Sequence, residues 1–152
     1  MVVVCCVLTL GCGGHRSSGP TDRSGGAKQT SQPEQRRAHE ADNLAYLEIA
    51  RASGTLRTNA AAAALGRAPR IANLPAIAAA TQTVLQLQPR DSGLITARKR
   101  MRAALDAALA ARGDRRSQRA AAIDALKATD GINRQLETYA ARHPDVQTLV
   151  PD

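Results

Sequence analysis

Apolar residues recur every three or four positions along the chain from about residue 38 onward, which is the spacing of one face of an α-helix. Gly66 and Pro69 follow the first such stretch, roughly residues 38 to 65, and predict that its helix ends there. The predicted buried face of this helix consists of Ala45, Ile49, Ala52, Leu56, Ala60 and Ala63.

Capping residues and helix breakers divide the rest of the chain into three more helical segments. Each segment opens on a side chain that can accept a hydrogen bond from a free backbone N–H, and each ends at a glycine or a proline. The predicted limits are Asn73 to Pro89 for the second segment, Asp91 or Ser92 to Gly113 for the third, and Asp114 or Ser117 to His143-Pro144 for the fourth.

Short connections between consecutive helices favour antiparallel neighbours. The pattern therefore predicts an all-α fold: a small, Ala-rich, up-and-down bundle of about four helices over residues 38–145, followed by a C-terminal tail over 146–152. Phe and Trp are absent, and Tyr46 and Tyr139 are the only aromatic residues. Because alanine buries little apolar area, we expect a marginally stable domain, or one completed by self-association or by a protein partner.

The first 37 residues have a different composition. Residues 12–37 are rich in Gly, Ser, Thr, Gln and Pro and nearly free of large apolar side chains. Such a stretch cannot bury enough surface to offset its ordering entropy, so we expect a disordered tether. The apolar run before it is about ten residues long, whereas a membrane-crossing helix needs about 20.

The segment from Val2 to Cys12, VVVCCVLTLGC, resembles the signal peptide and lipobox of bacterial lipoproteins. Gly11 fits the lipobox, whereas Thr9 stands where leucine is usual and no Lys or Arg follows Met1. The resemblance implies that residues 1–11 are a signal peptide that is removed, and that Cys12 is the lipidation site, carrying acyl chains such as palmitate. The protein would then be anchored in the cell membrane or outer membrane, facing the periplasm or the exterior.

The chain is strongly basic, with a formal net charge of +8 and a pI of about 10.4. Basic residues outnumber acidic ones most clearly between Arg90 and Arg119, where they suggest contact with anionic lipid or cell-wall polymer. A solvated basic surface without a partner is the simpler interpretation of the same charges. The candidate polyanion-binding residues are Arg98, Lys99, Arg100, Arg102, Arg115, Arg116 and Arg119.

No recognised catalytic or metal-binding motif is complete. His39-Glu40 could begin the zinc-protease motif H-E-x-x-H, but Asn43 occupies the place of the second histidine. His15 falls in the expected tether, and His143 lies at a predicted helix end, where a cation is favourable without implying catalysis. No serine lies in a G-x-S-x-G or S-x-x-K frame. We expect no enzymatic activity, no cofactor and no metal site.

These observations predict a lipid-anchored, exported helical module that acts by binding or scaffolding. One alternative is a binder of anionic lipid or wall polymer that works through residues 90–119. A second is a cytosolic helical protein that binds nucleic acid or a protein partner and whose N-terminus is misread as a leader. Nucleic acid is the least expected ligand, because the aromatic side chains on which bases stack are missing.

Overall fold

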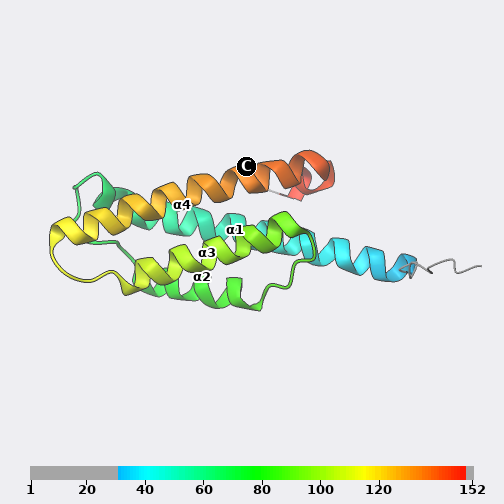
Figure 1. The fold of residues 1–152 in the computed structure, drawn as a ribbon, viewed down its shortest axis with the longest axis horizontal. Coiled ribbons are helices and arrows are strands. Elements are labelled where there is room, and N and C mark those ends of the chain that lie inside the picture. The colour runs from blue at the N-terminus through cyan, green and yellow to red at the C-terminus, as the bar shows by residue number, and fades with distance from the viewer. Residues whose placement is uncertain (1–30, 150–152) are drawn as a thin grey trace, which may run out of the picture.

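The computed structural model describes residues 31–149, which form four α-helices and a terminal 3₁₀ helix. The helices are α1 (Gln32–Ala64), α2 (Leu74–Gln86), α3 (Ser92–Ala110) and α4 (Arg115–Arg142), and the 3₁₀ helix is η1 (Pro144–Leu149). Successive α-helices run in opposite directions, and α4 lies against both α1 and α3 (Figure 1). The predicted all-α, up-and-down bundle of four helices is confirmed.

Three of the helices begin where local capping chemistry predicts. The side chain of Asn73 accepts a hydrogen bond from the N–H of Ala76 at 3.3 Å, and Asp91 accepts from Gly93 and Leu94 at 2.8 and 3.0 Å. Asp114 accepts from the N–H of Ser117 at 2.8 Å. Each bond satisfies an N–H group that has no partner inside its own helix, which fixes the start of the helix.

The first helix is longer than expected. It begins at Gln32, so residues 32–37 are helical and do not belong to the tether predicted over 12–37. The reason is a capping arrangement in which the Glu34 carboxylate accepts a hydrogen bond from the N–H of Ser31 at 3.1 Å, with a proline in the first turn. Residues 1–30, and with them the predicted leader, Cys12 and the rest of the tether, lie outside the described residues.

The fold also continues beyond residue 145, where we expected a tail to begin. Pro144 follows the end of α4 and opens η1, which runs to Leu149. Within η1 the side chain of Val146 is 0% exposed and belongs to the hydrophobic core. A proline cannot continue an α-helix, so the chain turns here and returns Val146 to the bundle.

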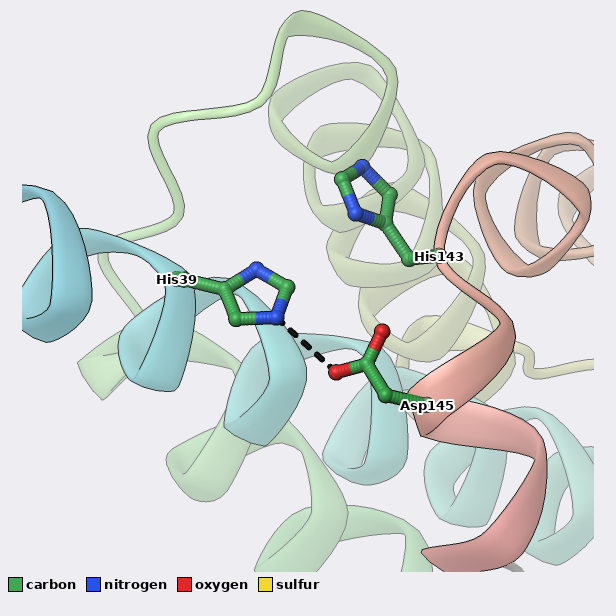
Figure 2. Close-up of side chains that lie close together, drawn as sticks. All are labelled: His39, His143 and Asp145. Carbon is green, nitrogen blue, oxygen red and sulfur yellow. Dashed lines mark hydrogen bonds and ion pairs between the residues drawn. The ribbon is translucent and has the colours of Figure 1, made fainter.

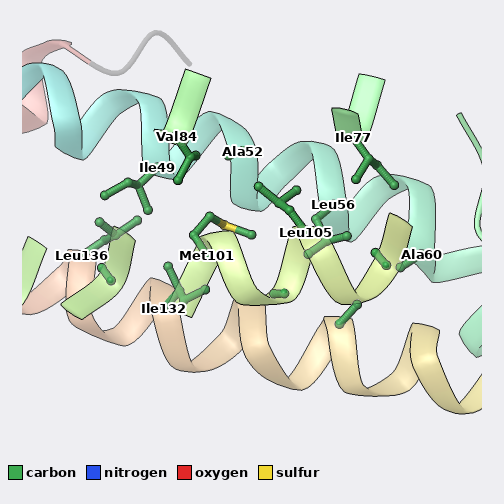
Figure 3. Close-up of a cluster of buried hydrophobic side chains, with 14 of the residues drawn as sticks. Ile49, Ala52, Leu56, Ala60, Ile77, Val84, Met101, Leu105, Ile132 and Leu136 are labelled. Carbon is green, nitrogen blue, oxygen red and sulfur yellow. The ribbon is translucent and has the colours of Figure 1, made fainter. Parts of the chain in front are cut away.

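The core is largely aliphatic and rich in alanine, with Tyr139 as its fully buried aromatic side chain (Figure 3). All six residues of the predicted face of α1 are buried. The larger side chains at the centre come from every helix, and small alanine faces let the backbones approach closely enough to bury them. The largest fully buried side chains include Ile49, Leu56, Ile77, Leu94, Met101, Leu105 and Ile132. None of the helices within residues 31–149 combines the length and the apolarity that crossing a bilayer requires.

Candidate functional site

Two histidines and an aspartate meet at one end of the bundle (Figure 2). His39 lies on α1, His143 directly follows α4, and Asp145 lies in η1. Their potential ligand atoms all lie within 4.8 Å of one another. The turn at the proline between His143 and Asp145 brings the carboxylate toward α1, where its Oδ2 lies 2.9 Å from His39 Nε2. We call these three residues the histidine–aspartate cluster.

Asn43 lies one helical turn after His39 and holds the cluster's carboxylate. Its Nδ2 donates a hydrogen bond to Asp145 Oδ2 at 3.0 Å, and its Oδ1 accepts one from the hydroxyl of Tyr139 at 3.0 Å. The hydrogen bond from His39, followed by that from Asn43, lowers the pKa of Asp145 from its usual value. The carboxylate is therefore ionised and oriented at neutral pH.

Tyr139 supports the cluster from inside the bundle. Its side chain is 1% exposed, and its ring stacks on His143 with centroids 4.4 Å apart and on Tyr46 at 5.7 Å. Burial raises the pKa of Tyr139 to about 12, and the nearby carboxylates, Asp42 foremost, add to the shift. The hydroxyl therefore stays protonated at neutral pH and keeps donating to Asn43.

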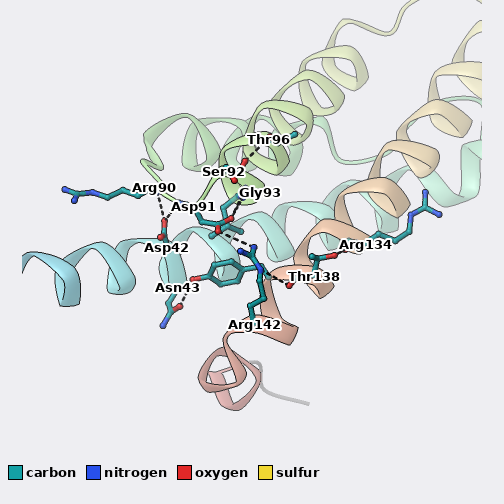
Figure 4. Close-up of polar contacts among 12 residues, drawn as sticks. Asp42, Asn43, Arg90, Asp91, Ser92, Gly93, Thr96, Arg134, Thr138 and Arg142 are labelled. Atoms are coloured by element: carbon teal, nitrogen blue, oxygen red, sulfur yellow. Dashed lines mark hydrogen bonds and ion pairs between the residues drawn. The ribbon is translucent and has the colours of Figure 1, made fainter. Parts of the chain in front are cut away.

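A second polar network secures the same end of the bundle (Figure 4). Asp42 on α1 accepts hydrogen bonds from the N–H groups of Arg90 and Asp91, at 2.6 and 3.2 Å. Asp91 caps α3 with one carboxylate oxygen, and its other oxygen lies 3.2 Å from an Nη of Arg142 on α4. These contacts connect α1 to the loop that precedes α3, and connect Asp91 in turn to α4. They therefore set the relative positions of His39 and His143.

Three of the arginines predicted to bind a polyanion donate hydrogen bonds to carbonyls at the ends of neighbouring helices. Arg98 donates to the carbonyls of Val84 and Leu85 in the last turn of α2, at 3.1 and 2.7 Å. At the end of α1, Arg119 donates to Ala64 O at 3.1 Å, and Arg115 donates to the carbonyl of residue 66 at 2.6 Å. Carbonyls in the last turn lack partners inside their helix and carry partial negative charge, so each guanidinium acts as a cap from another helix.

The other candidates of the basic region have fewer contacts. Arg102 forms the ion pair with Asp106 that its spacing on the helix predicts, at 3.5 Å. The side chains of Lys99, Arg100 and Arg116 make no hydrogen bond or ion pair within the described part of the chain. Arg100 borders a groove of about 570 Å³ between α3 and α4 that is lined mostly by alanine. The basic region is therefore divided between helix capping and free surface charge.

From the sequence alone, both histidines are candidates but nothing joins them. His39 is only the start of an incomplete zinc-protease motif, and Asp145 has no predicted role. Local signals existed in the one-turn spacing of His39 and Asn43 and in the H-P-D triplet from His143 to Asp145. The pairing itself spans 106 positions and depends on the packing of α1 against α4.

Comparison of this chain with protein-family models, curated proteins and solved structures finds no match.

Proposed function

We propose that this protein is an exported lipoprotein, acylated at Cys12, whose helical domain works at a membrane face as a binding or scaffolding module. The observation that carries the proposal is the apolar leader that ends in Leu10-Gly11-Cys12. Cys5 and Cys6 would leave with the leader, so the mature chain would hold a single cysteine, already consumed by the lipid. Several acyl chains, at about 0.8 kcal/mol per buried methylene, anchor a small protein firmly.

The arrangement of the domain is compatible with such an anchor. The helical part begins with the cap at Ser31, which leaves residues 13–30 between Cys12 and the domain. The buried side chains form one core inside the bundle. We therefore expect the domain to hold its shape beside a membrane that none of its described helices is long and apolar enough to cross. Tethering concentrates it at one surface, where weak contacts become effective.

A binding role is proposed in place of catalysis because of the partners that the histidines have. Within the described residues, the side chain of His39 contacts Asp145 and Asn43, and His143 stacks on Tyr139. Neither histidine has a serine hydroxyl within hydrogen-bond distance in this part of the chain, so no nucleophile and base are paired there.

Membrane fractionation in a bacterial host that carries out lipoprotein processing tests the proposal. The unaltered chain is expected in the detergent phase, and Cys12→Ser is expected to lose membrane attachment. The double variant Cys5→Ser, Cys6→Ser is the matched control, because both sulfurs lie in the leader and should leave attachment unchanged. If Cys12→Ser stays as firmly attached as the unaltered chain, the lipoprotein proposal is wrong.

A second candidate function is binding of an anionic lipid or wall polymer. The observation in its favour is that the side chains of Lys99 and Arg100 on α3 make no hydrogen bond or ion pair within the described residues, which leaves their charges available. Replacing Lys99, Arg100 and Arg102 by Gln should weaken retention on anionic vesicles in a salt-dependent manner. Arg98 is left intact in this test because it caps α2.

The control for this test removes the same charge elsewhere. Arg36, Arg37 and Arg134 are exposed and lie outside the basic region, so their replacement by Gln changes the net charge equally. If both triple variants lose retention to the same extent, only overall charge matters and residues 90–119 form no specific surface.

A further inference from the structure

We infer that His39, His143 and Asp145 form a binding site for one transition-metal ion of the imidazole-preferring class, with Zn²⁺ as its representative. This goes beyond the anchored module proposed above and does not depend on Cys12. It also departs from the expectation that the chain has no metal site, which rested on the lack of a local sequence motif.

The first support is the convergence of three donor atoms on one point. The nitrogen and oxygen ligand atoms all lie within 4.8 Å of one another. Zinc bonds of about 2.0 to 2.2 Å in tetrahedral geometry place ligand atoms about 3.3 to 3.6 Å apart. The His39 Nε2 to Asp145 Oδ2 distance of 2.9 Å is already close to that spacing. A bound zinc ion would draw the more distant ligand atoms toward that spacing.

The second support is the chemistry of the donors. Two imidazoles and one carboxylate are a common ligand set for Zn²⁺ and leave a fourth position for water or another ligand. Imidazole also suits Cu²⁺ and Ni²⁺, whereas Mg²⁺ and Ca²⁺ prefer oxygen donors alone. The side chains of His39 and Asp145 are 43% and 52% exposed, so an ion can reach them from solvent.

The third support is a set of neighbours that orients the donors in advance. Asn43 donates to the carboxylate of Asp145, and Tyr139 donates to Asn43 while its ring stacks on His143. Metal sites depend on such outer contacts to hold their ligands in a binding geometry. The rings of the two histidines lie 5.4 Å apart at a tilt of 43°.

An ion pair alone explains less of this arrangement. It accounts for the contact between His39 and Asp145 but gives His143 no role beyond its stacking on Tyr139. A metal ion uses all three side chains and joins the start of α1 to the turn after α4. Binding should therefore also raise the thermal stability of the chain, because an ion that binds only the folded state favours that state.

The test is calorimetric titration of Zn²⁺ into the full chain, with Cys5, Cys6 and Cys12 replaced by Ser so that no thiolate competes for the metal. One equivalent should bind at neutral pH. His39→Ala and His143→Ala should each lower affinity at least about tenfold, a loss that removal of even a supporting residue produces in metal sites. His15→Ala is the matched control, because His15 lies far from the cluster in sequence, and it should bind like the parent.

A second measurement needs no substitution in the cluster. One equivalent of Zn²⁺ should protect His39 and His143 from acylation by diethyl pyrocarbonate, read by peptide mass spectrometry, while His15 stays reactive. Absence of saturable binding, unchanged affinity in both cluster variants, or equal reactivity of all three histidines with and without Zn²⁺ would each overturn the inference.

Discussion

Replacing Arg98 tests whether the basic region of α3 is structural or available for ligands. Its guanidinium donates to the carbonyls of Val84 and Leu85, which end α2. Arg98→Met keeps the apolar stem and removes the charged donors, so packing of the stem is largely preserved. Arg100→Met is the matched control, because Arg100 lies on the same helix and is exposed.

The expected loss follows from the two hydrogen bonds. Bonds to a charged group contribute about 1.5 to 3 kcal/mol each when buried. Arg98 is only half-buried, so in Arg98→Met water can partly replace the lost guanidinium as a hydrogen-bond donor to the two carbonyls. We therefore expect a loss of about 2 kcal/mol in the free energy of unfolding. In a domain of this size, that corresponds to a fall in Tm of about 6 to 10 °C.

Circular dichroism melts and urea titrations of both variants measure this difference. Arg100→Met should stay within about 0.5 kcal/mol of the unaltered chain, as exposed substitutions usually do. Equal melting temperatures for the two variants would refute the capping role assigned to Arg98 and return that residue to the candidate polyanion surface.

Two further predictions concern the core and the start of α4. Leu105→Ala should lower the free energy of unfolding by about 3 kcal/mol in a urea titration, because Leu105 is fully buried; Leu44→Ala, at a position 55% exposed, should change it by less than about 0.5 kcal/mol. Equal losses would show that the assigned core is wrong. Hydrogen bonds from Ser117 lower the pKa of the Asp114 carboxyl group. The ionised carboxylate therefore stabilises the fold at pH values above its unfolded-state pKa, which is near 3.8. This stabilisation is lost as the pH falls through the lower pKa of the folded state. Asp114→Asn keeps a capping oxygen but does not titrate. Between about pH 5 and pH 2, the urea midpoint of this variant should therefore fall less than that of the unaltered chain. Parallel pH profiles for the variant and the unaltered chain would contradict the role of this carboxylate.

The elements predicted well from the sequence are those fixed by neighbours in the chain. Asn73, Asp91 and Asp114 cap helices through bonds that reach only two or three residues ahead. The spacing of apolar residues identified the buried face of α1 for the same reason, since a helix repeats every 3.6 residues. The early start of α1 was also readable, because Ser31 and Glu34 have the spacing of a capping box.

The contacts that escaped prediction join residues far apart in the sequence. Arg115 and Arg119 bind carbonyls 49 and 55 positions away, and His39 meets Asp145 across 106 positions. Such contacts depend on how far one helix is shifted along another, which the apolar pattern of a single helix does not specify. In an alanine-rich bundle many shifts bury similar surfaces, so long-range polar contacts are needed to select one of them.

Intact-mass analysis of the protein purified from its native cells tests the central claim most directly. The account predicts a chain that begins at residue 12 and carries the added mass of acyl chains, and it predicts that Cys12→Ser lacks this added mass. A native protein that still carries Met1 and an unmodified Cys12 would contradict it.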